Sequence, residues 1–219
     1  MRRIRPTQKL PVASTRDPER SQRRIFEAAF REFSAKGFAG ARVDVIARRA
    51  GINKRMLYHY FGNKEGLFRE VLRRKMAQRQ AWGIATPDEA SKSLPYWFDL
   101  AFKDPNWIRL LEWEALQFAG REMIDQQKRA QSATAAVGRI RARQRAGHLS
   151  QRFDSAEVLL AMTALTWFPV AFPQLTRLIT GKSVAGFRAR YRQFLSEFAG
   201  AFQHDLVLAK AAGNGHSKS

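Results

Sequence analysis

Apolar residues recur at intervals of three and four along nearly the whole chain, which is the spacing of one face of an α-helix. An aspartate and a proline at 17–18 have the order of an N-cap and a first helical residue, and Gly37 suits the left-handed residue that ends a helix. We therefore expect a first helix from residue 18 to about Gly37. Its apolar face consists of Ile25, Ala28, Ala29 and Phe33.

Three more helices and a boundary are expected next. Shorter patterns predict helices over 43–50 and 53–60, and a fourth helix starts at Lys64 and runs to about Trp82. Its apolar side consists of Leu67, Phe68, Val71 and Leu72. The Thr-Pro-Asp-Glu sequence at 86–89 predicts a capping box that opens the following helix, because a threonine precedes a glutamate by three residues.

The remaining segments also have helical spacing. An Asp-Pro pair opens a helix over 105–118, and a polar, arginine-rich helix follows over 120–146. Another helix begins after Asp154, and the prolines at 169 and 173 must kink or break it. The last helix covers 183–209. Since no segment alternates like a strand and none repeats, the predicted fold class is all-α.

Residues 42–64, RVDVIARRAGINKRMLYHYFGNK, have the layout of a helix, a tight turn and a second helix. Gly51 can adopt the positive φ that a sharp turn needs, and Asn53 is a good N-cap for the helix that follows. Ala47 is small where the two helices approach, and Leu57 is an apolar anchor. This layout is typical of a helix-turn-helix, which places its second helix in the major groove of DNA.

The DNA contacts are expected from the exposed side of this segment. Lys54 and Arg55 lie in the first turn of the recognition helix, where long cations reach guanine edges or phosphates. Tyr58 lies one turn further on and can touch a thymine methyl or a phosphate, while His59 and Lys64 suit the DNA backbone. The predicted DNA-binding residues are Arg42, Asn53, Lys54, Arg55, Tyr58, His59 and Lys64. Tyr60 and Phe61 are expected in the core.

Residues 20–70 resemble the DNA-binding domain of the TetR (tetracycline-repressor) family of bacterial transcriptional regulators. The matching elements are Phe33, Gly37 and Phe38, Ile46-Ala47, Ala50-Gly51-Ile52, Leu57-Tyr58-His59-Tyr60-Phe61 and Lys64-Glu65-Gly66-Leu67. The family often has threonine where this chain has Arg42, an acid where it has Val45, and a small residue where it has Lys54 and Arg55. We therefore expect a weaker cap on the second helix and a strong electrostatic contribution to DNA binding.

The same resemblance implies an all-α C-terminal domain that binds a small effector and dimerises through its last two helices. Aromatic residues that could line an effector cavity, or pack as ordinary core, are Trp97, Trp107, Trp113, Phe118 and Trp167. Residues that could form the dimer interface, or be buried within one subunit, are Phe168, Phe172, Leu175, Tyr191, Phe194, Phe198 and Phe202. An aromatic lining suggests a lipophilic or planar ligand.

Charge supports this division of the chain. The 219 residues carry a net charge of +20, and residues 1–82 hold 21 basic and 7 acidic residues, against 18 and 12 in residues 83–219. The excess positive charge is therefore concentrated in the predicted DNA-binding part, and the rest of the chain is closer to neutral. We predict a disordered basic arm over 1–16, the DNA-binding domain with its connecting fourth helix over 17–82, the effector-binding and dimerisation domain over 83–210, and a frayed tail over 211–219.

Composition excludes several kinds of protein. The chain has no cysteine, which excludes disulfides and a cysteine nucleophile, and no apolar run approaches the roughly 20 residues of a membrane span. The basic N-terminus lacks the apolar core of a secretory signal. We expect a cytoplasmic, nucleoid-associated bacterial protein without a membrane partner. No metal or other cofactor is predicted.

The function that best accounts for these features is that of a ligand-responsive, sequence-specific transcriptional repressor. Its homodimer would bind double-stranded DNA at a palindromic operator and be released by a small lipophilic effector. The alternatives are an activator and an effector-free, nucleoid-type protein that coats DNA through charge. An enzyme is not expected, because the chain has no glycine-rich phosphate loop, no metal-spaced cluster and no catalytic triad.

Overall fold

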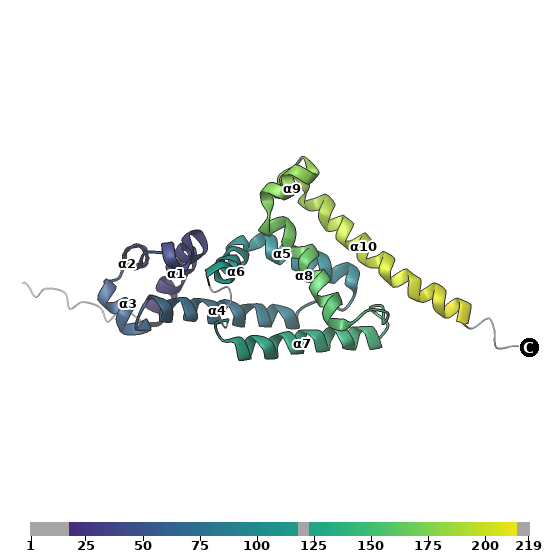
Figure 1. Ribbon diagram of the computed structural model, residues 1–219, viewed down its shortest axis with the longest axis horizontal. Coiled ribbons are helices and arrows are strands. Elements are labelled where there is room, and N and C mark those ends of the chain that lie inside the picture. The colour runs from purple at the N-terminus through teal and green to yellow at the C-terminus, as the bar shows by residue number, and fades with distance from the viewer. Residues whose placement is uncertain (1–17, 118–122, 214–219) are drawn as a thin grey trace, which may run out of the picture.

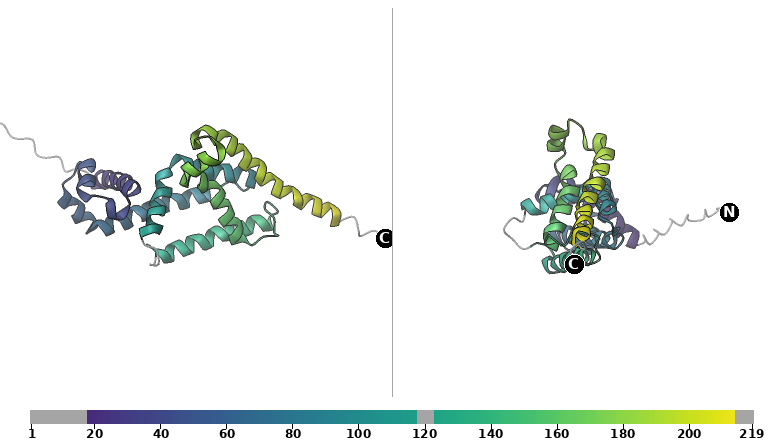
Figure 2. Two further views of the ribbon diagram at one scale, coloured as in Figure 1. Left: turned by 45° about the horizontal axis from the view of Figure 1, so that its top comes forward. Right: turned by 90° about the vertical axis from the view of Figure 1, so that its right-hand side faces the viewer.

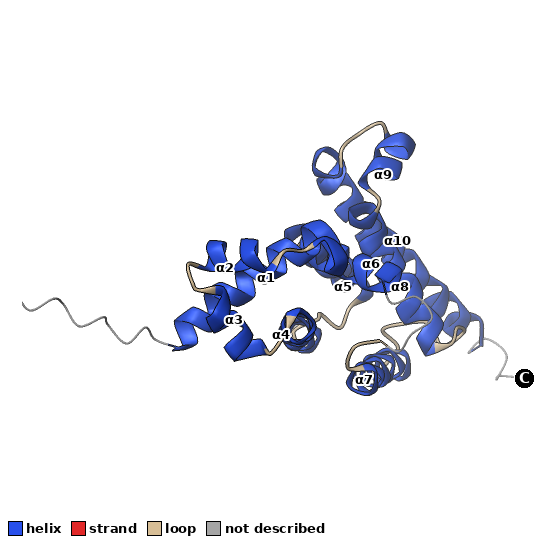
Figure 3. Cartoon of the chain, turned by 60° about the vertical axis from the view of Figure 1, so that its left-hand side comes forward, coloured by secondary structure: helices blue, strands red, loops and turns tan. Residues whose placement is uncertain are grey.

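The computed structural model describes residues 18–117 and 123–213, and within these ranges every regular element is a helix (Figures 1 and 3). The prediction of an all-α fold is confirmed. The basic arm and most of the predicted tail lie outside the described residues. The helices are α1 (Pro18–Gly40), α2 (Val43–Ala50), α3 (Lys54–Phe61), α4 (Lys64–Ile84), α5 (Ala90–Lys103), α6 (Pro105–Gln117), α7 (Gln126–Arg145), α8 (Ser155–Ala171), α9 (Pro173–Thr180) and α10 (Val184–Gly213).

Helices α1 to α3 form a head at one end of the molecule, and α5 to α10 form the body (Figure 1). Helix α4 belongs to both parts, since it starts beside α3 and runs into the body (Figures 1 and 3). The C-terminal end of α10 lies at the opposite end of the molecule from the head (Figure 2). Any change that moves α4 in the body therefore has a direct mechanical route to the head.

Helix α1 buries the face that its apolar spacing predicts. Ile25, Ala29 and Phe33 are fully buried, and the ring of Phe33 meets that of Phe68 from α4 edge-on, with centroids 4.9 Å apart. At Gly37 the helix is interrupted, with φ 68° and ψ 177°. The positive φ is as predicted, but the predicted helix end and left-handed helical conformation are wrong, because α1 continues to Gly40 across this kink. The backbone is extended with positive φ, and the Trp113 ring of α6 lies against it.

The head and the body share one continuous hydrophobic core. Trp107, Ile108 and Leu110 of α6 belong to the same buried cluster as Ile46 of α2 and Leu57 of α3. Contacts between α1 and α6 are among the most extensive between any two helices in the described parts of the chain. The head is therefore packed on the body and not only joined to it by the chain.

The predicted capping box at 86–89 is wrong. Helix α5 begins at Ala90, and its N-cap is Glu89, whose side chain makes no capping hydrogen bond. The Thr86 hydroxyl instead donates to the carbonyl oxygen of Trp82, at 3.3 Å. Arg143 from α7 donates to the carbonyl oxygens of Thr86 and Pro87, at 3.2 and 2.8 Å. These bonds hold the segment as a non-helical connection between α4 and α5.

In the body, α5 packs against both α8 and α10, and α7 packs against α8. A second buried cluster joins Leu94 and Phe98 of α5 to Leu195 and Ala199 of α10. Helix α7 starts at Gln126, later than the predicted residue 120. Residues 118–122, which include the end of the predicted preceding helix, lie outside the described part of the chain.

The break in the apolar region before the last helix falls at Phe172. Helix α8 tolerates Pro169 near its C-terminal end, whereas Pro173 is the first residue of α9, where its missing N–H costs nothing. Gly181 ends α9 in a left-handed conformation, with φ 70°. No single helix in the described ranges is long and apolar enough to cross a membrane. Helices α8 and α9 pass that test only together, and they meet at 91°.

Candidate DNA-binding surface and ligand cavity

The turn between α2 and α3 has the geometry that its residues predict. Gly51 ends α2 with φ 63° and ψ 39°, the left-handed conformation that glycine adopts without strain. Asn53 then caps α3, and its side-chain oxygen accepts a hydrogen bond from the backbone N–H of Arg55 at 2.8 Å. Such a cap fixes the residue at which the helix begins.

One face of α3 holds the helix on the head. Leu57 is fully buried, while Tyr60 and Phe61 are partly buried and pack against the same core, as predicted. Ala47 of α2 is also buried where the two helices approach. The orientation of α3 is therefore fixed by apolar contacts on one side only, which leaves its other side free for a partner.

The opposite face of α3 carries four exposed side chains: Lys54, Arg55, Tyr58 and His59. The Lys54 ammonium lies 5.8 Å from the centre of the Tyr58 ring, so these two side chains present a charge and an aromatic plane next to each other. Helix α3, which is described over its whole length, contains no acidic residue. A protruding cationic helix of this kind suits the major groove, where cations reach phosphates and base edges.

Two further predicted contacts lie at the edges of this face. Arg42 precedes α2 without capping it by a side-chain bond, and its exposed guanidinium pairs with Asp44 at 3.2 Å. The Lys64 ammonium donates to the carbonyl oxygen of Ala39 at 3.1 Å and lies over the Phe38 ring. Burial lowers the pKa of Lys64. Part of the Lys64 interaction is therefore internal to the head, in addition to any contact with DNA.

Three of the predicted aromatic residues come together in the body. Trp97, Trp107 and Trp167 line a cavity of about 350 Å³ between α4, α5, α6, α7 and α8. Trp113 does not line it, because its ring packs on Gly37 of α1 and is partly exposed. Phe118 lies outside the described residues.

Sequence reasoning missed the most polar feature of this cavity, which is Arg79 of α4. Its guanidinium is buried among the rings of Trp82, Trp97, Trp107 and Trp167, with Cζ 5.3–5.7 Å from the four ring centres. One signal could have found it. Positions 68, 72, 75 and 79 follow the spacing of the buried face of α4, so a basic residue at 79 is expected to point inward.

The residues predicted for a dimer interface differ in how far the single subunit buries them. Phe168, Phe172, Leu175 and Phe194 are substantially exposed on α8, α9 and α10. Phe198 is partly buried, and the side chain of Phe202 lies outside the described part of the structure. These three helices therefore carry large apolar side chains that remain exposed in the single subunit.

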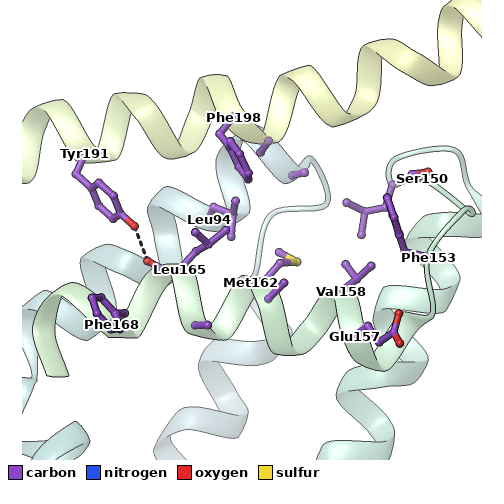
Figure 4. A pocket seen from close by; sticks show the side chains of 15 residues that line it. Leu94, Ser150, Phe153, Glu157, Val158, Met162, Leu165, Phe168, Tyr191 and Phe198 are labelled. Carbon is purple, nitrogen blue, oxygen red and sulfur yellow. Dashed lines mark hydrogen bonds between the residues drawn. The ribbon is translucent and has the colours of Figure 1, made fainter. Parts of the chain in front are cut away.

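Tyr191 is the exception, since its interactions are within the subunit (Figure 4). Its hydroxyl donates to the carbonyl oxygen of Leu165 at 2.9 Å, and its ring meets Phe98 edge-on. Burial raises the pKa of Tyr191. Beside it, an almost wholly apolar hollow of about 650 Å³ separates α8 from α10, with Met162 and Phe198 on its two sides (Figure 4).

A short, capped, cationic helix that is anchored on one face and exposed on the other defines a helix-turn-helix DNA-binding protein. Comparison with known proteins makes this class more specific. Residues 25–71 match the bacterial regulatory proteins of the tetR family, and residues 96–200 match the tetracyclin repressor-like C-terminal domain. The chain belongs to the TetR family, and it is a transcriptional repressor of that type.

Individual relatives agree with this assignment. The chain is 34% identical over 173 residues to the HTH-type transcriptional repressor SCO4008 of Streptomyces coelicolor, which covers 79% of this chain and 90% of that protein. The crystal structure of a transcriptional regulator, SCO4942 of Streptomyces coelicolor, superimposes with a TM-score of 0.67 at 26% identity, over 81% of this chain and 97% of that one. FadR of Bacillus subtilis, solved with stearoyl-CoA, has the same fold, with a TM-score of 0.60 at 18% identity over 80% and 97% of the two chains.

Proposed function

We propose that this protein is a ligand-responsive repressor that binds a palindromic operator as a homodimer and is released by a small lipophilic effector. The observation that carries the proposal is α3, whose cationic face is exposed while Leu57 on its other face is fully buried. One helix of eight residues reads few base pairs, so specificity requires two heads on a two-fold axis. A DNA partner also implies work in the bacterial cytoplasm, at the nucleoid.

The decisive experiment is selection of bound DNA from a random pool, followed by footprinting. A repressor of this kind should enrich an inverted repeat whose half-sites lie about one helical turn, or a multiple of it, apart. The alternative of an effector-free, nucleoid-type protein predicts no enriched sequence and a steep loss of affinity with salt. An activator would give the same footprint but would raise transcription from the adjacent promoter.

Substitution of Arg55 tests the role of α3. Arg55→Gln should lower operator affinity about 10- to 100-fold, since a good base or phosphate contact is worth about 1–3 kcal/mol. Arg145→Gln is the matched control, because it removes the same charge from an exposed position in the last turn of α7, at the end of that helix away from the head (Figure 1). Equal losses in both variants, measured by fluorescence anisotropy at constant salt, would show that only net charge matters.

For the dimer we propose the exposed apolar face of α8, α9 and α10. Its large exposed side chains are Leu160, Phe168, Phe172, Leu175, Leu178, Ile179 and Phe194. Many large apolar side chains exposed on neighbouring helices are typical of an interface. Phe172→Glu should give a monomer in sedimentation equilibrium, whereas Leu116→Glu, at an equally apolar exposed position on α6, should leave the dimer intact. A dimer that survives Phe172→Glu together with Phe194→Glu would exclude this face.

We further propose that the tryptophan-lined cavity receives the effector. A ligand there would touch Arg79 on α4 and Trp107 on α6, and both helices also contact the head. Trp113, six residues after Trp107 on α6, packs on Gly37 of α1. Occupation of the cavity can therefore bias the position of the head through two packed helices. The test is whether a bound ligand releases the selected operator.

A further inference from the structure

The tryptophan-lined cavity contains a buried charged side chain, Arg79 of α4. Arg79 is only 9% exposed, and neither Nη1 nor Nη2 has a hydrogen-bond partner within the described structure. A buried arginine normally pairs its donors with a carboxylate or carbonyl oxygens, because an unpaired buried charge is costly. The tryptophan rings around it offset part of that cost through their π-faces, but they supply no oxygen acceptor.

The acid whose charge acts on Arg79 is already engaged elsewhere, since Asp104 accepts a hydrogen bond from Lys75. Burial lowers the pKa of Arg79 to about 10, while the charge of Asp104 acts to raise it. The guanidinium therefore stays protonated at neutral pH. Its charge is retained in a site where the protein provides no direct partner.

The rest of the lining has the same electrostatic character. Among the described residues that line the cavity, three are arginines, Arg79, Arg139 and Arg143, and none is acidic. The indole Nε1 of Trp107 is a second buried donor without an acceptor. A cage of four tryptophan rings could by itself bind a quaternary ammonium ligand. Here the guanidinium of Arg79 already occupies the position of the cation among these rings. The described lining therefore supplies cationic and N–H donors but no anionic acceptor.

We propose that this cavity binds a small planar aromatic carboxylate, with the carboxylate on the guanidinium of Arg79 and the ring among the tryptophans. Arginine offers a fork of two parallel N–H donors that matches a carboxylate. A volume of about 350 Å³ suits a ligand of one or two rings, at the small end of protein ligand sites. This inference deepens the proposed function, on which it rests, by naming the chemical class of the effector.

The test is isothermal titration calorimetry of the full-length protein, without DNA, against a matched set of probes. The probes are benzoate, 2-naphthoate, 2-naphthamide, decanoate and choline. The wild-type protein should bind 2-naphthoate about 10- to 100-fold more tightly than the isosteric, uncharged 2-naphthamide, because hydrogen bonds to charged groups are the stronger kind. It should bind choline more weakly than either. Tighter binding of decanoate than of both aromatic acids would identify an acyl ligand and overturn the planar part of the proposal.

Two variants assign the preference to one side chain. Arg79→Gln should reduce the preference of carboxylate over carboxamide to within about threefold. Arg139→Gln, an exposed arginine that also lines the cavity, is the matched control and should keep most of it. Circular dichroism checks the fold, and Arg79→Lys, which keeps the charge but loses the fork, gives an intermediate preference if the glutamine variant does not fold.

Several results would overturn the proposal: no binding of benzoate or 2-naphthoate at millimolar concentration, equal affinity for acid and amide, or an unchanged preference in Arg79→Gln. Operator release, followed separately by fluorescence anisotropy, distinguishes this failure from that of the proposed function. A carboxylate that binds through Arg79 without releasing DNA would contradict its role as effector but not the ligand chemistry. Release by a compound that binds equally well to Arg79→Gln would contradict the ligand chemistry alone.

Discussion

Gly37→Ala should destabilise the protein strongly, although it adds a single methyl group. Gly37 has φ 68° and ψ 177°, a region of backbone space that is essentially reserved for glycine. An L-residue held there costs about 1–3 kcal/mol. A Cβ atom at this position would also lie 2.7 Å from Cε3 and 2.8 Å from Cδ2 of the Trp113 ring, closer than real Cβ contacts come.

The steric overlap with Trp113 adds to the backbone strain at residue 37. Displacing an indole ring that packs between α1 and α6 is an overpacking change, which typically costs about 1–3 kcal/mol. We therefore expect a total loss of about 2–6 kcal/mol in the free energy of unfolding, measured by urea denaturation followed by circular dichroism at 222 nm. Gly40→Ala is the matched control. Its Cβ would meet only the Lys36 Cβ, at an ordinary 3.5 Å, and its stability should change by less than about 1 kcal/mol.

The double variant Gly37→Ala/Trp113→Ala separates the two causes. It removes the overlap with the ring but leaves the backbone strain, so the effect of Gly37→Ala measured in the Trp113→Ala background should fall to about 1–3 kcal/mol. A loss below about 0.5 kcal/mol for Gly37→Ala in the wild-type background would refute the reasoning. It would mean that the backbone at residue 37 relaxes into an ordinary helical conformation and that the α1–α6 junction does not depend on glycine.

Two other substitutions probe the cap of α3 and the buried pair in the body. Asn53→Ala removes the acceptor for the Arg55 N–H and should cost about 1 kcal/mol of stability. Operator affinity should also fall, because the start of α3 is no longer fixed, and Asn53→Ser should restore both. Glu114→Gln leaves the nearly buried Arg129 without its anionic partner, so unfolding in urea should require about 3–5 kcal/mol less free energy. Replacing both residues by apolar ones, as Glu114→Leu/Arg129→Met, should cost much less, and an equal loss in the two variants would contradict this account.

The head could be predicted from the sequence because its geometry depends on neighbours along the chain. Gly51 and Asn53 act within one turn of where they stand, and the buried position of Leu57 follows from helical spacing alone. A turn, a cap and a buried stripe are local properties, so residue type and spacing decide them. The same reasoning failed at Thr86, whose conformation depends on hydrogen bonds from Arg143, 57 residues further along the chain.

The cavity could be predicted only in part. Spacing and size select large aromatic side chains, and three of the five chosen do meet around one cavity. Which of them meet depends on how α4, α5, α6 and α8 cross, and that arrangement places Trp113 on α1 instead. Tyr191 shows the same limit. Its helix face is clear from the sequence, but its partners, Phe98 and the Leu165 carbonyl oxygen, come from two other helices.

The hydrogen bonds that a ligand could make to Arg79 limit how far that ligand can lower operator affinity. A ligand can shift the protein between DNA-bound and released arrangements only by the difference in its affinity for the two. If only the released arrangement admits a carboxylate to Arg79, hydrogen bonds to this charged group provide about 1.5–3 kcal/mol, which is roughly a 10- to 150-fold loss of operator affinity at saturation. Arg79 lies 15 residues after Lys64 on the same helix, about 22 Å at 1.5 Å per residue. Since α4 spans that distance as one continuous helix, a small displacement at Arg79 reaches the corner where Lys64 holds the end of α1, next to the recognition helix.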